Sequence, residues 1–221
     1  MQKRPWRAEF FASFASECAE VSPQIRRILE LGSGPGFLAQ HLLQSLSHID
    51  LVLLDFSSAM HELARARLGE LASRTTFVER SFKNEGWSVG LGTFECVVTN
   101  QAVHELRHKR HAVNLHTQVR ALLNPGGVYL VCDHFDGEGG MKNESLYMSI
   151  AEQLEALQLA GFASVRQVMV KGGLVLHHAA WPFHRVDLHL HGASGPRFIL
   201  GLTRPACASC SCQTPRRFET R

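Results

Sequence analysis

The sequence contains no apolar run long enough to cross a lipid bilayer. Apolar segments such as Ile49–Leu54 are short, whereas a membrane-spanning helix needs about 20 residues. The first residues, Met1–Trp6, are followed by Glu9 before any long apolar stretch, which is not the pattern of a secretory signal. We therefore expect a cytoplasmic protein that does not bind membranes.

The sequence also lacks internal repeats and a strong overall charge of either sign. Its formal net charge is +3, and the excess comes from residues 181–221, where six arginines stand against Asp187 and Glu219. A nearly neutral remainder without a basic face gives no support to nucleic-acid binding. Apolar residues make up 45% of the 221 residues, enough for a sizeable core in one domain.

The six cysteines do not form the pattern of a disulfide framework. Cys18, Cys96 and Cys132 are scattered among apolar residues, as expected for small buried side chains in a reducing compartment. The others lie within Cys207–Cys212 and lack a second regular pair of ligands. We therefore predict no metal site.

Residues 1–180 alternate between short apolar runs and longer amphipathic segments, which predicts an α/β fold. The predicted helices are 5–20, 37–46, 57–71, 109–123 and 143–159. The predicted strands are 26–31, 49–54, 75–79, 94–99, 128–132, 165–170 and 174–180. Nearly continuous apolar strands indicate a sheet covered on both faces. We expect a Rossmann-like, doubly wound sheet of seven strands, mostly parallel, whose closing hairpin adds one antiparallel strand at the edge.

The alternation of elements stops at Trp181. Residues 181–221 are rich in Pro, Gly, Ser, His and Arg and keep no helical or strand period. The chain is therefore predicted to consist of a folded domain over residues 1–180 and a disordered, basic C-terminal tail over residues 181–221.

A glycine-rich segment, residues 29–37 with the sequence LELGSGPGF, carries the strongest chemical signal. It lies between a predicted strand and a predicted helix, where glycines allow a tight turn and a close approach of the backbone to a ligand. A dinucleotide fingerprint requires glycine at the position of Phe37, so the spacing disfavours NAD. Here the third glycine is Gly36, and Glu30 stands two residues before Gly32.

This Glu-x-Gly-x-Gly-x-Gly string resembles the first motif of the class I S-adenosylmethionine-dependent methyltransferases. The resemblance extends over about residues 1–180 and is closest to a group of small bacterial methyltransferases. It implies that S-adenosylmethionine is the cofactor and that the loop wraps its methionine and ribose portion. The residues implied in this contact are Glu30, Gly32, Gly34 and Gly36. Without a ligand, the same segment would be only a tight strand–helix turn.

Asp55 follows Gly32 by 23 residues and ends the second predicted strand. A carboxylate there can accept hydrogen bonds from both ribose hydroxyls of an adenosine, so it indicates a nucleoside without choosing between cofactors. Alternatively, it is an acidic residue at a helix N-terminus. The resemblance also implies that Met60 contacts the adenine, although its helical position alone is more typical of a core residue.

Ser81 and Phe82 follow the third predicted strand. Many members of the family have an aspartate at the position of Ser81, where it accepts a hydrogen bond from the adenine amine. A serine hydroxyl can accept this bond without charge, so we expect a weaker contact. The ring of Phe82 can pack either against the adenine or within the core.

The segment 94–106 resembles the fourth motif of the family, with Glu95 where aspartate is commoner. Asn100 falls at the carboxyl end of a central strand, where ligands bind in open α/β sheets, and we count it among the cofactor-binding residues. The segment 122–128, LLNPGGV, matches the family's turn into the fifth strand and supports the fold rather than the chemistry.

Methyl transfer from a sulfonium requires mainly alignment and a dry pocket, and a general base only where the acceptor must lose a proton. His104 and His134, each just past a strand end, are the candidate bases. Asp133 and Glu105 are second choices, and each histidine can instead be a hydrogen-bonded structural residue. The glycine-containing loop over residues 136–143 is a candidate lid.

The sequence therefore predicts methyl transfer from S-adenosylmethionine to an unidentified acceptor, which we expect to be a small molecule. One alternative is a non-catalytic binding protein with the same fold, which Ser81, Glu95 and the tail would favour. A second alternative is an NAD-dependent oxidoreductase, which Phe37 disfavours.

Overall fold

The computed structural model describes residues 5–21 and 25–181. The predicted tail, with Cys207–Cys212, lies outside the described residues apart from Trp181. Trp181 donates its backbone N–H to the Gly127 carbonyl at 3.0 Å, and the Arg120 guanidinium lies 4.9 Å from its ring centroid. The described fold therefore extends one residue into the segment assigned to the tail. Within the described residues, none of the helices has the length and apolar character needed to span a membrane.

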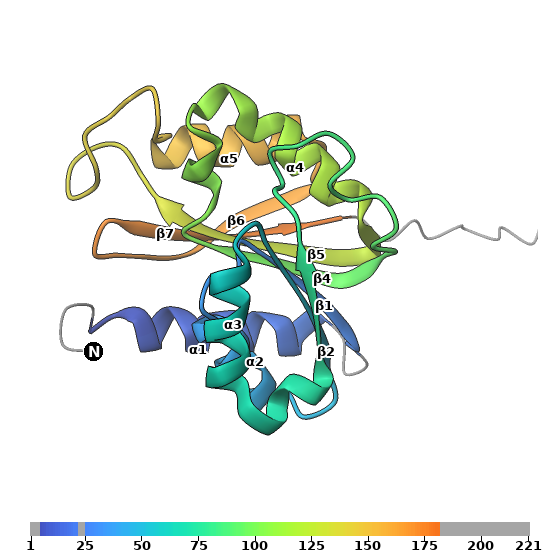
Figure 1. The fold of residues 1–221 in the computed structure, drawn as a ribbon. Helices are drawn as coiled ribbons and strands as arrows, with labels where there is room; N and C mark the ends of the chain where they lie inside the picture. The colour runs from blue at the N-terminus through green and yellow to red at the C-terminus, as the bar shows by residue number, and fades with distance from the viewer. Residues whose placement is uncertain (1–4, 22–24, 182–221) are drawn as a thin grey trace, which may run out of the picture. The chain divides into compact units, whose positions relative to one another are not determined.

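Within the described residues, seven strands form a single sheet in the order β3-β2-β1-β4-β5-β7-β6 (Figure 1). The strands are β1 (Arg27–Leu31), β2 (Asp50–Asp55), β3 (Thr75–Glu79), β4 (Phe94–Asn100), β5 (Leu123–His134), β6 (Ser164–Lys171) and β7 (Leu174–Ala180). The pairs within β1–β5 are parallel, and β7 is antiparallel to both of its neighbours. The predicted fold class is confirmed.

The antiparallel strand does not lie at the edge of the sheet, so that part of the prediction is wrong. β7 lies between β5 and β6, and β6 forms the edge. The side chains explain this order, because Leu174, Val175 and Leu176 of β7 are buried. β6 instead carries Arg166 and Lys171 and is largely exposed, as is common for an edge strand.

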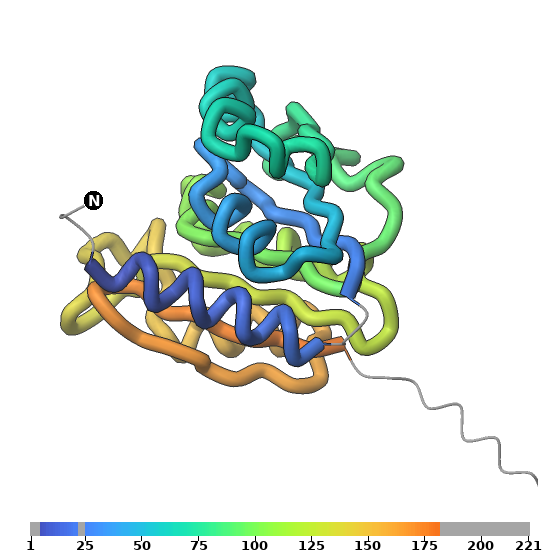
Figure 2. The backbone as a smooth tube through the Cα atoms, turned by 90° about the horizontal axis from the view of Figure 1, so that it is seen from below, coloured from blue at the N-terminus to red at the C-terminus, as the bar shows by residue number. Residues whose placement is uncertain are grey.

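In the part of the chain that the structure describes, five α-helices cover the two faces of the sheet (Figure 1). One face carries α1 (Arg7–Val21), α2 (Phe37–Ser45) and α3 (Ser58–Leu68), and the other carries α4 (Ala112–Ala121) and α5 (Ile150–Leu159). Figure 2 shows α1 running along β5, and its contacts extend to β4 and β6. Two apolar clusters result, one under α1–α3 and one under α4 and α5. The sheet is therefore covered on both faces, as the apolar strands predicted.

The predicted helix over residues 143–159 is shorter in the structure and begins at Ile150. Ser149 and Glu152 form a capping box, in which the Ser149 hydroxyl accepts from the Glu152 N–H at 3.2 Å and the Glu152 carboxylate accepts from the Ser149 N–H at 2.7 Å. Asn143 instead starts a turn, with its side-chain oxygen accepting from the Leu146 N–H. The capping pair, readable in the sequence, sets the true start of the helix.

Three other predicted boundaries also differ in the structure. α3 ends at Leu68 because Gly69 has a positive φ of 55°, and a 3₁₀ helix (Gly69–Arg74) follows. The predicted helix over 109–123 divides into a 3₁₀ turn (Lys109–His111) and α4. β5 begins at Leu123 rather than at residue 128, because Leu123 pairs with Phe94 ahead of a register shift.

The buried imidazole of His116 makes the stability of the fold dependent on pH. Burial, with a smaller effect of His177, lowers the pKa of His116 to about 3. The unfolded chain binds a proton near pH 6.5 and the folded chain does not, so stability is lost as the pH falls below 6.5. This loss is about 2 kcal/mol between pH 6.5 and 5, at about 1.4 kcal/mol per pH unit.

We therefore expect His116→Leu to unfold with a shallower dependence on pH than the wild type between pH 7 and 5. Urea denaturation at several pH values measures the slope directly. His48→Leu, at an exposed histidine before β2, is the control. Equal slopes for wild type and His116→Leu would show that folding does not lower the pKa of His116.

Candidate functional site

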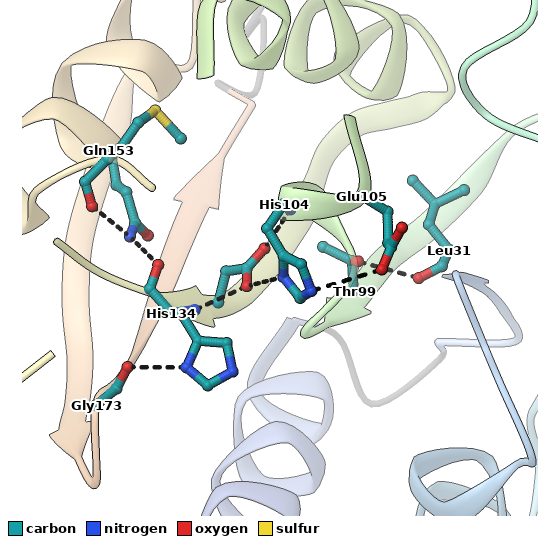
Figure 3. Close-up of polar contacts among 9 residues, drawn as sticks. Leu31, Thr99, His104, Glu105, His134, Gln153 and Gly173 are labelled. Carbon is teal, nitrogen blue, oxygen red and sulfur yellow. Dashed lines mark hydrogen bonds and ion pairs between the residues drawn. The ribbon is translucent and has the colours of Figure 1, made fainter. Parts of the chain in front are cut away.

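The candidate site lies at the carboxyl ends of β1, β2 and β4, where the strand order changes direction. On one side of β1 the sheet continues through β2 to β3. On the other side of β1 it continues through β4 to β5. The Thr99 hydroxyl of β4 donates to the Leu31 carbonyl of β1 at 3.0 Å, as Figure 3 shows, and ties the two strands together just before the glycine loop. Such a change of direction is where open α/β sheets bind ligands.

All three glycines of the loop have positive φ angles, which residues with a Cβ atom rarely adopt. The angles are 66° at Gly32, 52° at Gly34 and 76° at Gly36. A Cβ on Gly32 would lie 2.4 Å from the Cβ of Ala102, and one on Gly36 would lie 3.0 Å from the Cβ of Ala64. A Cβ on Gly34 would meet no atom within 4 Å. Gly32 and Gly36 therefore allow the loop to pack closely against Ala102 and Ala64. Gly34 leaves open space above the loop.

Asp55 holds the glycine loop against the start of α3. Its Oδ2 atom accepts from the Gly34 N–H at 2.8 Å, and its Oδ1 atom accepts from the Ser57 N–H at 2.9 Å. The hydroxyl of Ser57, rather than Asp55, caps α3 by accepting from the Met60 N–H. Since each carboxylate oxygen can accept more than one hydrogen bond, Asp55 keeps capacity for further donors.

Glu30 is a buried carboxyl group just before the loop. It is 3% exposed, and its Oε2 atom has no hydrogen-bond partner among the described residues. Burial, with a smaller contribution from the charge of Asp55, raises the pKa of Glu30 to about 8. Glu30 therefore carries a proton at neutral pH, and it supplies an unused polar atom beneath the glycine loop.

A cavity of about 370 Å³ lies beside the glycine loop. It is lined by five of the residues predicted to bind the cofactor: Gly32, Asp55, Met60, Ser81 and Phe82. These residues lie at or after the carboxyl ends of β1, β2 and β3. Gln101 and Ala102, which follow β4, complete the lining of the cavity. The structure thus brings together residues from four separate parts of the sequence.

The sequence reasoning missed several residues that line this cavity. They are Phe56, Arg80, Lys83, Gln101, Ala102 and Arg107. Phe56, Arg80 and Gln101 each directly follow a strand end, and this position was the sequence signal that could have identified them. Asn100, in contrast, does not line this cavity and faces a much smaller pocket beside Trp6 and Phe10.

A second group of polar side chains surrounds Asp133 near the end of β5. His104, from the 3₁₀ helix Val103–Leu106 after β4, places its Nδ1 atom 2.7 Å from the Oδ1 atom of Asp133. Asp133 also accepts from the backbone N–H of His104 at 2.9 Å and from that of His134 at 2.7 Å. The hydrogen bond with Asp133 raises the pKa of His104 above its usual value.

The rings of His104, His134 and Tyr147 form a compact cluster, with centroids 5.7 to 5.9 Å apart. The Nδ1 atom of His134 lies 3.3 Å from the Gly173 carbonyl, as Figure 3 shows. This cluster lines a narrow pocket of about 20 Å³. Both histidines predicted as candidate bases therefore lie side by side at the ends of the central strands.

The predicted lid loop is largely exposed but is closed by backbone hydrogen bonds, in which the Met141 N–H donates to the Phe135 carbonyl at 2.8 Å and the Asp136 N–H to the Met148 carbonyl at 3.0 Å. Asp136 and Met141 form an isolated bridge, and the Asp136 carboxylate accepts from the Asn143 N–H at 3.2 Å. The loop leads back to Tyr147 and so borders the ring cluster. Across residues 5–21 and 25–181, no three His, Cys, Asp or Glu side chains are grouped to hold a metal ion.

A family model described as a methyltransferase domain matches residues 28–127. This range contains the glycine loop, Asp55, Ser81, His104 and the turn before β5. A search of curated protein sequences gave no significant match.

Solved structures with the same fold include an O-methyltransferase family protein from Burkholderia thailandensis, with a TM-score of 0.66 and 16% identity over 79% of this chain and 57% of that one. The glycopeptide N-methyltransferase MtfA, solved with S-adenosylmethionine, gives a TM-score of 0.62 and 18% identity over 78% of this chain and 93% of that one.

The N-methyltransferase NodS from Bradyrhizobium japonicum WM9 gives a TM-score of 0.65 and 14% identity over 82% of this chain and 99% of that one. The chain thus matches only 57% of the length of the Burkholderia protein but nearly the full length of NodS. Residues 28–127 are thus similar to a methyltransferase domain, and the described residues have the Rossmann-like fold of these methyltransferase structures.

Proposed function

We propose that the protein transfers a methyl group from S-adenosylmethionine to a small-molecule acceptor. One observation carries this proposal: five residues implied by the family resemblance line a single cavity at the point where the strand order changes direction. The complex of MtfA with S-adenosylmethionine, on the same fold, supports this choice of cofactor.

The residues present fit this cofactor. Asp55 would hold the ribose, since its oxygens keep capacity for hydroxyl donors, and Met60, Ser81 and Phe82 would hold the adenine. The open space above Gly34 and the unpartnered oxygen of Glu30 suit the polar methionine end. When bound, S-adenosylmethionine supplies an activated methyl group on a sulfonium, so the protein contributes alignment and exclusion of water.

The departure from the family pattern at Glu95 does not disturb this site. Glu95 lies at the amino end of β4 and accepts from the Arg27 N–H at 2.8 Å and from the Asn124 side chain at 3.1 Å. Its role is to join β1 and the start of β5 to β4, at the end of the strand opposite the cavity. The substitution of Glu95 for aspartate therefore does not favour a non-catalytic protein.

Isothermal titration calorimetry with S-adenosylmethionine, S-adenosylhomocysteine and NAD tests the choice of cofactor. We expect the first two to bind and NAD not to bind. Binding of NAD alone would overturn the proposal. Production of S-adenosylhomocysteine with a library of metabolites then tests catalysis, and cofactor binding without turnover of any acceptor would favour the non-catalytic alternative.

Replacing Ser81 by aspartate is expected to tighten binding of S-adenosylmethionine by up to about 10-fold, or to leave it unchanged. A charged acceptor binds the adenine amine more strongly than a hydroxyl does, by roughly 1 kcal/mol. Lys83, which lines the same cavity, offsets part of the added charge. Calorimetry measures the effect, with Ser81→Ala as the control that removes the acceptor. Loss of binding in a folded Ser81→Asp protein would show that Ser81 does not face the amine.

A further inference from the structure

The residues that follow β3 form one end of the cavity of about 370 Å³ beside the glycine loop. Arg80, Ser81, Phe82 and Lys83 all line this cavity. We call these four residues the base end, because Ser81 and Phe82 are proposed to hold the adenine. None of the four has a carboxylate side chain. Polar recognition of a base by these side chains therefore depends on a hydroxyl, an ammonium and a guanidinium group.

Both oxygen atoms of Ser81 already accept hydrogen bonds within its own turn. The Ser81 hydroxyl oxygen accepts from the Lys83 backbone N–H at 3.3 Å, and the Ser81 carbonyl accepts from the Asn84 N–H at 3.0 Å. Among the described residues, none accepts the hydrogen of the Ser81 hydroxyl. Ser81 therefore offers a bound base a donor at least as readily as an acceptor.

Lys83 adds a second donor at the base end. Its side chain is exposed, and its ammonium nitrogen lies 5.8 Å from the ring centroid of Phe56, which lines the same cavity. Within residues 5–21 and 25–181, no carboxylate forms an ion pair with Lys83. An ammonium group donates hydrogen bonds and cannot accept one. Lys83 therefore favours a ligand that presents an acceptor at this end of the cavity.

Arg80 is engaged with the loop that precedes β4. Its Nη1 atom donates to the Trp87 carbonyl at 3.1 Å and to the Val89 carbonyl at 2.7 Å. A guanidinium group, like an ammonium group, has no acceptor to offer. Among the four side chains of the base end, the Ser81 hydroxyl is thus the one group that can accept a hydrogen bond.

The carboxylates that line the cavity come from other segments and have partners of their own. Asp55, at the end of β2, accepts from two backbone N–H groups and is the proposed ribose ligand. Glu105, which follows β4, lies 3.8 Å from the Nε2 atom of His104 and 3.4 Å from the Nη2 atom of Arg107. Neither carboxylate belongs to the base end, so the side chains that a base meets there are mainly donors.

A second, polar cavity of about 210 Å³ borders the base end and shares Phe82 and Lys83 with it. Asn84 and Asn114 also line this second cavity, and both are exposed. Water that reaches such a surface can hydrogen-bond a polar group almost as well as protein does. A polar group at the edge of a bound base therefore does not become buried without a partner, whichever way its hydrogen bond runs.

The purines adenine and hypoxanthine differ at C6 in the direction of the hydrogen bond. The C6 amine of adenine donates, whereas a C6 oxygen accepts. A carboxylate at the base end would pair with the amine and repel the oxygen, and sites of that kind reject the wrong ligand strongly. A hydroxyl beside an ammonium group can bind either, because the hydroxyl rotates and the ammonium pairs with the oxygen.

We propose that the cavity does not select the 6-amino group of the cofactor and also binds its 6-oxopurine form, with Ser81 and Lys83 as the residues responsible. This inference rests on the proposed S-adenosylmethionine site. The ribose and the amino-acid portion are the same in both ligands, so Asp55 and the glycine loop would hold them alike. The relative affinity of the two ligands then depends on the base end alone.

Isothermal titration calorimetry of the whole chain with S-adenosylhomocysteine and S-inosylhomocysteine compares the two bases directly. These sulfides carry the same net charge and differ only in the base. We expect S-inosylhomocysteine to bind within about 10-fold of S-adenosylhomocysteine, whereas a site built around the amine would discriminate by about 10²-fold or more.

A carboxylate at position 81 should create the selectivity that the wild type lacks. In Ser81→Asp we expect the preference for S-adenosylhomocysteine over S-inosylhomocysteine to rise by about 10- to 100-fold. Ser81→Asn is the matched control, since a carboxamide has the shape of a carboxylate but both donates and accepts. An unchanged preference in folded Ser81→Asp would show that Ser81 does not face C6 of the base.

The role of Lys83 is tested by removing its charge while keeping an unbranched side chain. In Lys83→Met we expect S-inosylhomocysteine to bind about 10-fold more weakly, with S-adenosylhomocysteine within about 2-fold of wild type. Lys171→Met is the matched control, because Lys171 lies on β6, at the edge of the sheet opposite to β3. An equal loss for both ligands, or no loss for either, would overturn the assignment to Lys83.

The outcomes separate this inference from the proposed function. If S-adenosylhomocysteine and S-adenosylmethionine do not bind the wild type, the proposed function fails. If both bind but S-inosylhomocysteine binds more than about 10-fold more weakly, the proposed function stands and the relaxed recognition of the base is overturned. Thermal unfolding of each ligand-free variant distinguishes a loss of binding from a loss of structure.

Discussion

Replacing Asp55 by alanine is expected to weaken binding of S-adenosylmethionine by about 2–4 kcal/mol, or about 30- to 1000-fold. The substitution would remove the two charge-assisted hydrogen bonds that we propose Asp55 makes to the ribose. It also releases the N–H groups of Gly34 and Ser57, which donate hydrogen bonds to Asp55. Because the loop must then be ordered by the ligand itself, part of the binding free energy is spent on that ordering.

Calorimetry with S-adenosylmethionine measures this effect, and thermal unfolding of the ligand-free variant confirms that it is folded. Asp50→Ala is the matched control, since Asp50 lies on the same strand but is exposed at its opposite end. We expect its affinity to equal that of the wild type. Unchanged affinity in Asp55→Ala would mean that Asp55 does not hold the ribose.

Two glycines of the loop are expected to respond differently to alanine. In Gly32→Ala the new Cβ would lie 2.4 Å from the Cβ of Ala102 at a φ of 66°, so the loop after β4 must move. We expect a loss of stability of about 2–4 kcal/mol together with loss of cofactor binding. In Gly34→Ala the Cβ meets no protein atom, and backbone strain alone should cost about 1 kcal/mol.

Gly34→Ala should nevertheless bind S-adenosylmethionine poorly, because its Cβ fills the space into which the ligand would fit. Urea denaturation and calorimetry on both variants separate the two effects. A stable Gly34→Ala protein with full affinity would show that the cofactor does not approach this glycine. A fully stable Gly32→Ala protein would contradict the close packing of Gly32 on Ala102.

The helices, the strands and the glycine loop were predictable because the sequence patterns that indicate them are local. Alternating apolar strands, the glycine spacing and the turn before β5 each depend on a few neighbouring residues. The position of β7 between β5 and β6 was not predicted, because it depends on which of two adjacent strands is the more apolar. The start of α5 was missed although the Ser149–Glu152 pair was readable in the sequence.

The site was only partly predictable because side-chain direction depends on local backbone geometry. Asn100 was predicted to bind the cofactor, but the chain turns at Gln101, which has a φ of 58°, and Gln101 lines the cavity instead. A non-glycine residue in this conformation has no sequence signal. The pairing of His104 with Asp133 likewise joins residues 29 positions apart, and no local pattern reveals it.

The place of β7 in the sheet also has a consequence for how the chain folds as it leaves the ribosome. β6 is made before β7, yet among the described strands β7 is the one that pairs with it. The edge strand therefore has nothing to pair with until the residues up to Ala180 have emerged. The strands β1, β2 and β3 can pair with one another early. The other side of the sheet keeps an unpaired, apolar edge at β5 until β7 has been synthesised. A protein that stalls at that stage would be a natural client for chaperones.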